Sequence, residues 1–341
     1  MKRNRKNLLI ISIIIITILI FNNKLAELIA KYSAGFSIVF WSILLEAMPF
    51  VLLGCLISSL IGQFISANFL AKLIPKNRIL GILFAALLGI VFPLCECIIV
   101  PITRRLIKKG LPMPLAIAFM LSVPILNPVV LFSTHYAFKG HSFVVFLRAV
   151  LGYFAAVTIA ILIGRIFGYD YNPIQKNNLK PNLKIKYDKV LVSQKQTKTN
   201  RASNKNIISI IQNVLSHTFW EFTDVLKFLI LGAFLSAILQ TTIPRNAILK
   251  IGTNNFISVP ILMLLAFLLS LCSEADAFIA RTFVGQFSYG GIISFLIFGP
   301  MLDIKNMMML FGAFKKKFVI ILMATISLIC FAFGILVNVV I

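Results

Sequence analysis

Long apolar runs, separated by short segments rich in Lys and Arg, dominate this chain. A helix that spans a bilayer needs about 20 apolar residues. The runs that reach this length are Leu8–Ala30, Phe36–Gly62, Met113–Ser133, Ser142–Phe167, Phe222–Leu239, Gly290–Phe311 and Phe318–Val340. Two further apolar stretches, Ile79–Pro101 and Ile257–Val284, are interrupted by polar residues near their middle. The pattern predicts an all-α polytopic membrane protein.

The composition agrees with this class. Hydrophobic residues make up 60% of the 341 residues and charged residues 13%, whereas a soluble domain carries about 45–50% and about 25%. The net charge of +23 comes from Lys and Arg that lie between the apolar runs, as expected of the cytoplasmic loops of a membrane protein. The balance therefore excludes a cytosolic enzyme and gives no reason to expect a nucleic-acid partner.

Composition divides the chain into four segments. Residues 1–35 form a first transmembrane helix, and the basic run at residues 2–6 predicts a cytoplasmic N-terminus in the cell membrane. Residues 36–168 form a first membrane repeat. Residues 169–218 are rich in Lys, Asn, Gln and Ser, which predicts a basic cytoplasmic linker. Residues 219–341 form a second membrane repeat.

The two membrane segments share short patterns in the same order, at an offset near 177 residues. The matching features are Trp41 and Trp220, Leu94-Cys95-Glu96-Cys97 and Leu271-Cys272-Ser273-Glu274, Arg104 and Arg281, and Val123-Pro124-Ile125-Leu126-Asn127 and Gly299-Pro300-Met301-Leu302-Asp303. Ordered matches of this kind indicate an internal duplication.

The positive-inside rule sets the topology of the repeats. All the basic segments face the cytoplasm only if Ile79–Pro101 enters and leaves the membrane on one side. The matching stretch, Ile257–Val284, then does the same from the opposite side. We therefore expect an inverted-topology repeat with two re-entrant, broken-helix hairpins. The alternative treats both stretches as full spans, which gives nine helices and leaves Arg104 and Arg105 outside.

The first candidate site is Cys95, Glu96 and Cys97, which lie between Pro93 and Pro101. Irregular backbone within a membrane is tolerated only where protein or water satisfies its polar groups. Thiolates are soft ligands for Cu(I), Zn(II) and thiophilic metalloids. The alternative is that both cysteines are small apolar packing residues.

The second candidate site is Cys272, Glu274 and Asp276 within the other interrupted stretch. A charged side chain at the centre of a membrane helix costs roughly 2.5–3.5 kcal/mol on insertion scales, which favours a cation or proton site. With Cys95 and Cys97, Glu274 is a candidate metal ligand. The alternative is that Asp276 forms a structural pair with Arg281.

Asn127 and Asp303 occupy matching places beside prolines, which predicts broken helices whose carbonyl groups could complete the site. Lys305 could neutralise Asp303 if the backbone between them is irregular. Arg104 and Arg105 are either topology anchors or, with Arg281, a site for an anionic group.

These motifs resemble one family. Phe92-Pro-Leu-Cys-Glu-Cys97, Pro124-Ile-Leu-Asn-Pro128, Leu271-Cys-Ser-Glu-Ala-Asp-Ala-Phe278 and Phe298-Gly-Pro-Met-Leu-Asp303 are similar to the predicted-permease family that includes the organoarsenical efflux permeases. The resemblance covers residues 36–168 and 219–340. It implies a permease, and relatives of this subtype imply a second small membrane protein as a partner. Many relatives carry Ser where this chain has Glu96. An acidic residue between two thiols suits a metal cation better than an organoarsenical substrate.

Together these observations predict a secondary transporter that exports a metal or metalloid species. Cys95, Glu96, Cys97, Asn127, Cys272, Glu274, Asp276 and Asp303 would form its substrate site. No cofactor or enzymatic activity is expected, because the chain has no phosphate-binding loop or catalytic motif. Two alternatives stay open. One is a transporter or flippase of an organic or lipid-linked anion, and the other is a non-transporting membrane subunit of a complex.

Overall fold

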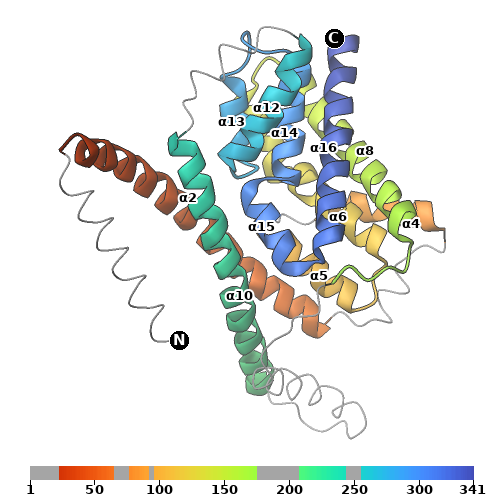
Figure 1. The fold of residues 1–341 in the computed structure, drawn as a ribbon. Coiled ribbons are helices and arrows are strands. Elements are labelled where there is room, and N and C mark those ends of the chain that lie inside the picture. Colours follow the sequence, from red (N-terminus) through yellow and green to blue (C-terminus); the bar gives the residue numbers. More distant parts are fainter. Residues whose placement is uncertain (1–22, 65–76, 92–95, 175–206, 243–254) are drawn as a thin grey trace, which may run out of the picture.

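The computed structural model describes residues 23–64, 77–91, 96–174, 207–242 and 255–341. In the first half these residues form α2 (Asn23–Phe64), α4 (Arg78–Leu87), the 3-10 turn η1 (Leu88–Ile90), α5 (Glu96–Lys108), α6 (Met113–Leu126), α7 (Pro128–Ala137) and α8 (Ser142–Phe167). In the second half they form α10 (Ile207–Thr242), α12 (Asn255–Leu269), α13 (Asp276–Arg281), α14 (Tyr289–Met301), α15 (Ile304–Ala313) and α16 (Lys316–Val340) (Figure 1).

The structure confirms an all-α polytopic membrane protein. Among the described residues, five helical stretches are long and apolar enough to cross a membrane: Gly35–Leu53, Met113–Ala137, Ser142–Phe167, Tyr289–Ala313 and Lys316–Val340. Two of these stretches are composite, because α6 and α7 are separated at Asn127 and α14 and α15 at Leu302 and Asp303. The broken helices that the prolines predict are therefore present in both halves.

Two helices cross the boundaries expected from composition. α2 continues without a break through residue 35, and α10 begins at Ile207, inside the segment expected to be a linker. The expected spans Leu8–Ala30 and Phe36–Gly62 are therefore not separated by a helix end within the described residues. Most of the first expected span, Leu8–Ala30, lies outside the described residues.

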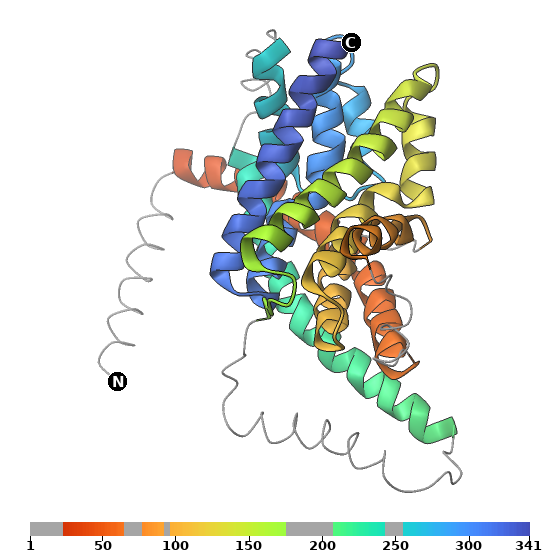
Figure 2. The ribbon, with the colours of Figure 1, turned by 90° about the vertical axis from the view of Figure 1, so that its right-hand side faces the viewer.

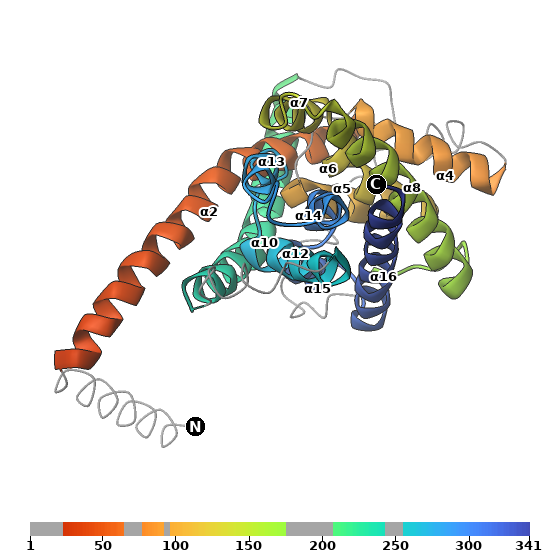
Figure 3. The ribbon, with the colours of Figure 1, turned by 90° about the horizontal axis from the view of Figure 1, so that it is seen from above.

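The two halves repeat the same order of helices and the same packing. α4 packs against α6 and α8, and α6 against α5, α7 and α8. In the second half α12 packs against α14 and α16, and α14 against α13 and α16. The halves then join through α2 with α10 and through α6 and α8 with α14 and α16 (Figures 1 and 3). Figure 3 also shows that the start of α2 projects away from the other helices.

Equivalent helices of the two halves run in opposite directions. The Phe143 ring at the start of α8 lies 5.0 Å from the Tyr289 ring at the start of α14. The Phe167 ring in the last turn of α8 lies 5.3 Å from the Phe318 ring in the first turn of α16. Figure 2 shows the ribbons of α8 (yellow-green) and α16 (dark blue) approaching each other toward their lower ends in the view. α6 begins beside Gly164, near the end of α8. Thus α8 is antiparallel to α16, and α6 to α14.

The interrupted stretch of the first half begins and ends at the same end of the molecule. The Arg78 guanidinium, where α4 begins, lies 4.9 Å from the Tyr169 ring, just beyond the end of α8. α5 finishes at Lys108, a few residues before α6 begins at that end. We call this end, where Arg78, Lys108 and Lys315–Lys317 gather, the basic end.

The interrupted stretch of the second half begins and ends at the other end. Near the start of α12, the Ser258 hydroxyl lies 2.9 Å from the hydroxyl of Ser288, the N-cap of α14. The Arg281 guanidinium at the end of α13 lies 5.9 Å from the Phe138 ring, in the turn before α8. Each stretch therefore begins and ends at one end of the molecule, and we call the two stretches the hairpins.

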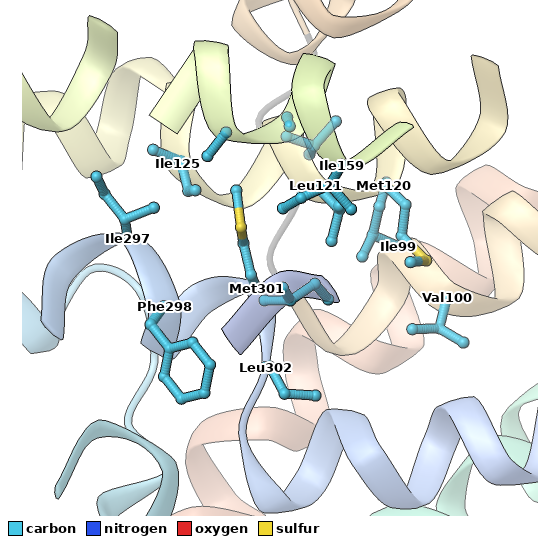
Figure 4. Packing of buried hydrophobic residues seen from close by; sticks show 14 of the residues in the cluster. Ile99, Val100, Met120, Leu121, Ile125, Ile159, Ile297, Phe298, Met301 and Leu302 are labelled. Atoms are coloured by element: carbon cyan, nitrogen blue, oxygen red, sulfur yellow. The ribbon is translucent and has the colours of Figure 1, made fainter. Parts of the chain in front are cut away.

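The core lies where the two halves meet. Ile125 and Ile159 of the first half face Ile297 and Met301 of the second (Figure 4). Some helices approach so closely that a side chain larger than that of glycine forces its neighbours to shift: a Cβ at Gly334 of α16 would collide with the Ser294 hydroxyl of α14. Small residues at helix crossings are typical of membrane proteins, because close packing replaces the hydrophobic drive.

We predict that Gly334→Ala destabilises the protein by about 1–3 kcal/mol, since an overpacked contact must shift backbone or side chains. Gly299→Ala is the matched control, because its Cβ would meet Ala266 at an ordinary 3.5 Å. Helix propensity favours Ala in both variants. Thermal unfolding in detergent micelles would contradict this assignment if the two variants melted alike.

We predict that the basic end faces the cytoplasm. A membrane-impermeant maleimide should label Lys139→Cys, which is exposed at the opposite end, in intact cells. It should label Lys108→Cys and Lys316→Cys only after permeabilisation. Labelling of Lys108→Cys in intact cells would instead support nine spans.

Candidate substrate site

The tips of the two hairpins meet in the middle of the molecule. Glu96 is the first residue of α5, and Ser273 lies just before α13. The Ser273 backbone N–H donates to Glu96 Oε2 at 3.2 Å, although the two residues are 177 positions apart. Both side chains are completely buried. Because 177 is also the spacing of the sequence repeat, matching positions of the two halves are in direct contact here.

A cluster of buried charges surrounds this contact. The Lys305 ammonium lies 3.6 Å from Glu96 Oε1 and 3.6 Å from Asp303 Oδ2. The Ser270 hydroxyl donates to Asp303 Oδ2 at 2.7 Å. We call Glu96, Ser270, Asp303 and Lys305 the central cluster. It joins the first hairpin to the broken helix α14–α15 of the second half.

The residues at the helix breaks act as N-caps. Asn127 Oδ1 accepts a hydrogen bond from the Val129 N–H at 2.9 Å, and Asp303 Oδ1 accepts one from the Asn306 N–H at 2.6 Å. These bonds satisfy backbone donors that a helix start leaves free. Asp303 adopts an extended backbone (φ −128°, ψ 178°). The irregular backbone lets Asp303 and Lys305 approach each other, which a regular helix at this spacing would prevent.

Two of the candidate thiols lie close to the central cluster. Cys97 and Cys272 are buried, and both lie within electrostatic range of the Lys305 ammonium. The Cys272 thiol donates to Glu274 Oε2 at 2.7 Å. Cys95 lies outside the described residues. Within the residues the structure describes, no group of three His, Cys, Asp or Glu side chains is arranged to hold a metal ion.

Asp276 has a different partner from the one the sequence suggested. The Arg148 guanidinium of α8 donates to Asp276 Oδ1 at 3.0 Å and to Oδ2 at 2.8 Å. It also donates to the Thr134 hydroxyl and to the Ser273 carbonyl. The alternative in which Asp276 pairs with Arg281 is therefore wrong, because Arg148 binds both carboxylate oxygens. The signal for Arg148 was present, since it is an Arg inside the apolar run Ser142–Phe167, far from the end of the run where Arg165 lies.

The arginines proposed as one anion site lie far apart. Arg104 and Arg105 are half-buried on α5, near the basic end, whereas Arg281 ends α13 at the opposite end. Arg104 lies eight residues along the helix from Glu96, about 12 Å. Just beyond α5, burial and the neighbouring Arg105 lower the pKa of Lys109. A basic cluster at a helix end fits a topology anchor better than a central anion site.

The two buried networks differ in what they can do chemically. The Arg148–Asp276 pair is bidentate: each carboxylate oxygen accepts one N–H of the guanidinium. This geometry is strong and specific. The central cluster combines Glu96 and Asp303 with one ammonium, and Glu274 adds a third carboxylate nearby. Its formal charge is therefore negative, and it lies beside two thiols. Such a site can attract a cation or a proton.

We predict that Arg148→Ala and Asp276→Asn each destabilise the protein by about 3–5 kcal/mol, because each leaves a charged or polar partner buried without its counterpart. The double variant Arg148→Met, Asp276→Leu should recover most of this loss, since apolar side chains can replace a buried pair. Thermal unfolding in micelles measures all three. If the double variant lost as much stability as the sum of the two single variants, the stabilisation would not come mainly from the contact between Arg148 and Asp276.

Comparison with known proteins supports a transport function. The UPF0718 protein YcgR of Bacillus subtilis (strain 168) is 43% identical over 300 residues, which cover 88% of this chain and 96% of that protein. A protein of Streptococcus mutans serotype c (strain ATCC 700610 / UA159) is 39% identical over 302 residues, 88% of this chain and 94% of its own. That protein is provisionally named a two-component membrane permease complex subunit.

No solved structure matches the chain. The family model described as "Predicted permease" matches residues 33–339, which include both hairpins, both broken helices and the central cluster. The chain is therefore a multi-pass membrane protein that belongs to the predicted permease family.

Proposed function

We propose that this permease is a secondary transporter that exports a thiophilic metal or metalloid species through the central cluster. The observation that carries the proposal is the meeting of the two hairpin tips, where Glu96 contacts Ser273 and the Cys97 and Cys272 thiols lie nearby. Thiols bind soft metals and metalloids, and carboxylates balance positive charge. Cys95 and Glu274 complete the proposed ligand set, and Asn127 and Asp303 hold the broken helices beside it.

The proposed transport cycle uses an inverted repeat. The antiparallel courses of α8 and α16 support it, as do hairpins that start from opposite ends. Transporters built in this way bind substrate where discontinuous helices meet, and one half then rocks against the other. We place the substrate at the contact of the two hairpin tips, from which it could be released to either end.

A second membrane protein is part of the proposal. The name of the Streptococcus mutans relative supports a two-component assembly. The central cluster is contributed by this chain alone, so the partner would regulate or complete access rather than supply its charges. An organic-anion transporter is the weaker alternative, because Arg104 and Arg281 lie near opposite ends of the molecule.

We predict that Cys97→Ser combined with Cys272→Ser abolishes a change in cellular element content that the unaltered protein produces. Cells overproducing either form would be grown in sublethal zinc, copper, cobalt and arsenite, and whole-cell elemental analysis would compare them. Export predicts that one element is lowered only by the unaltered protein.

Cys330→Ser is the matched control. Cys330 is also a buried thiol in an apolar helix, but it packs against Met301, with its sulfur 4.0 Å from the Met301 sulfur. The control should keep the full change in element content. Equal element contents in cells with the unaltered and the doubly substituted protein would remove the thiols from the mechanism.

A further inference from the structure

Lys305 is the one lysine in the described part of the chain that is buried inside the protein. Its residue is 4% exposed, and its charge lies between a carboxylate of the first half and one of the second. On its other side α10 closes against the backbone, since a Cβ at Gly232 would lie 2.9 Å from Lys305 Cα. The backbone of Lys305 is thus packed closely against α10, whereas its ammonium lies at the end of a long flexible side chain.

The contacts of the ammonium are loose. Both carboxylate oxygens lie 3.6 Å away, whereas a charge-assisted N–H···O bond is about 2.7–2.9 Å long. Glu96 Oε1 has no hydrogen-bond partner among the described residues, although it is fully buried. The Arg148–Asp276 pair, in contrast, is closed at 2.8 and 3.0 Å. Lys305 therefore neutralises charge without locking the two carboxylates in place.

The internal repeat does not duplicate the charges of the central cluster. Glu96 faces Ser273, its own counterpart, which has no charge. Asp303 and Lys305 correspond to Asn127 and Val129, since the helix breaks of the two halves align. The described residues thus hold one buried cluster with two carboxylates and one ammonium, and the ammonium balances only part of their negative charge.

We propose that Lys305 is a tethered counter-cation, and that the cargo is a cation which displaces it from Glu96 and Asp303. This inference rests on the proposed function and narrows its substrate class, because a neutral metalloid would have no reason to compete with an ammonium. Without cargo, Lys305 balances part of the negative charge of Glu96 and Asp303, and the returning ammonium helps to expel the cargo. Because Glu96 and Lys305 come from different halves, this exchange is sensitive to their relative position.

The test is zinc binding to the purified full-length protein in detergent micelles, measured by titration calorimetry with Zn²⁺ alone. Lys305→Met should lower the Kd by about tenfold or more, which is about 1.4 kcal/mol, because the competing charge is gone. Lys305→Arg should raise the Kd, because a guanidinium fork can bind both carboxylates more firmly. Lys316→Met, at an exposed lysine, should leave the Kd unchanged.

A further variant assigns any gain in affinity to the cluster. Adding Glu96→Gln to Lys305→Met should remove the tighter binding, and persistence of the gain would overturn the proposal. An unchanged or higher Kd in Lys305→Met would also overturn it. If Lys305→Met does not fold, Lys305→Arg is the deciding variant. If Lys305→Arg binds Zn²⁺ as tightly as the unaltered protein or more tightly, displacement of the Lys305 ammonium by the cation is excluded.

Failure of the proposed function gives a different result. If Lys305→Met binds Zn²⁺ no more tightly but Cys97→Ser, Cys272→Ser binds it more weakly, the counter-cation is excluded and the thiol site stands. If neither variant changes the Kd, both proposals fail.

Discussion

The burial of ionised side chains at membrane depth is the constraint on which the rest of this structure depends. An unpaired charge in the hydrocarbon region is costly, so such residues face the interior and pair with one another. In the described part of the chain, the two buried cations each have a carboxylate partner in the other half. Arg148 of α8 holds Asp276 of the second hairpin, and Lys305 of α15 lies against Glu96 of the first. Asp276 and Glu96 thus each have their cationic partner in the other half, so assembly of the two halves satisfies these charges.

This reciprocal arrangement also explains why the hairpins penetrate so deeply. Irregular backbone within a membrane needs polar partners from the protein. The segment before α13 receives them from the first half, where Glu96 accepts from the Ser273 amide and Arg148 donates to the Ser273 carbonyl. The Ser133 hydroxyl also donates to the Glu274 carbonyl. The backbone of the second hairpin tip is thus held by side chains from three helices of the other half.

Much of this organisation was predictable from the sequence because apolar length, proline position and Lys/Arg placement act locally. The expected spans Met113–Ser133, Ser142–Phe167 and Phe318–Val340 lie within or coincide with the helical stretches of the structure. The expected helix breaks at Asn127 and Asp303 are present. Pairing across the halves was not predictable, because it depends on which faces meet. Asp276 therefore seemed able to pair with Arg281, five residues away, when its true partner is Arg148.

The broken helices show why capping and function are hard to separate in such a protein. Asn127 and Asp303 have the same local task, since each accepts a hydrogen bond from the helix that it begins. Only Asp303 carries a charge, and its second oxygen accepts from Ser270 and lies near Lys305. The Asp303 carboxylate thus caps the helix that follows the break and also belongs to the central cluster. Two repeats have two helix breaks, and each break needs a cap. Only one charged cluster is needed where the two halves meet. The difference between Asn127 and Asp303 is therefore the difference between a cap alone and a cap that also belongs to a buried charge cluster.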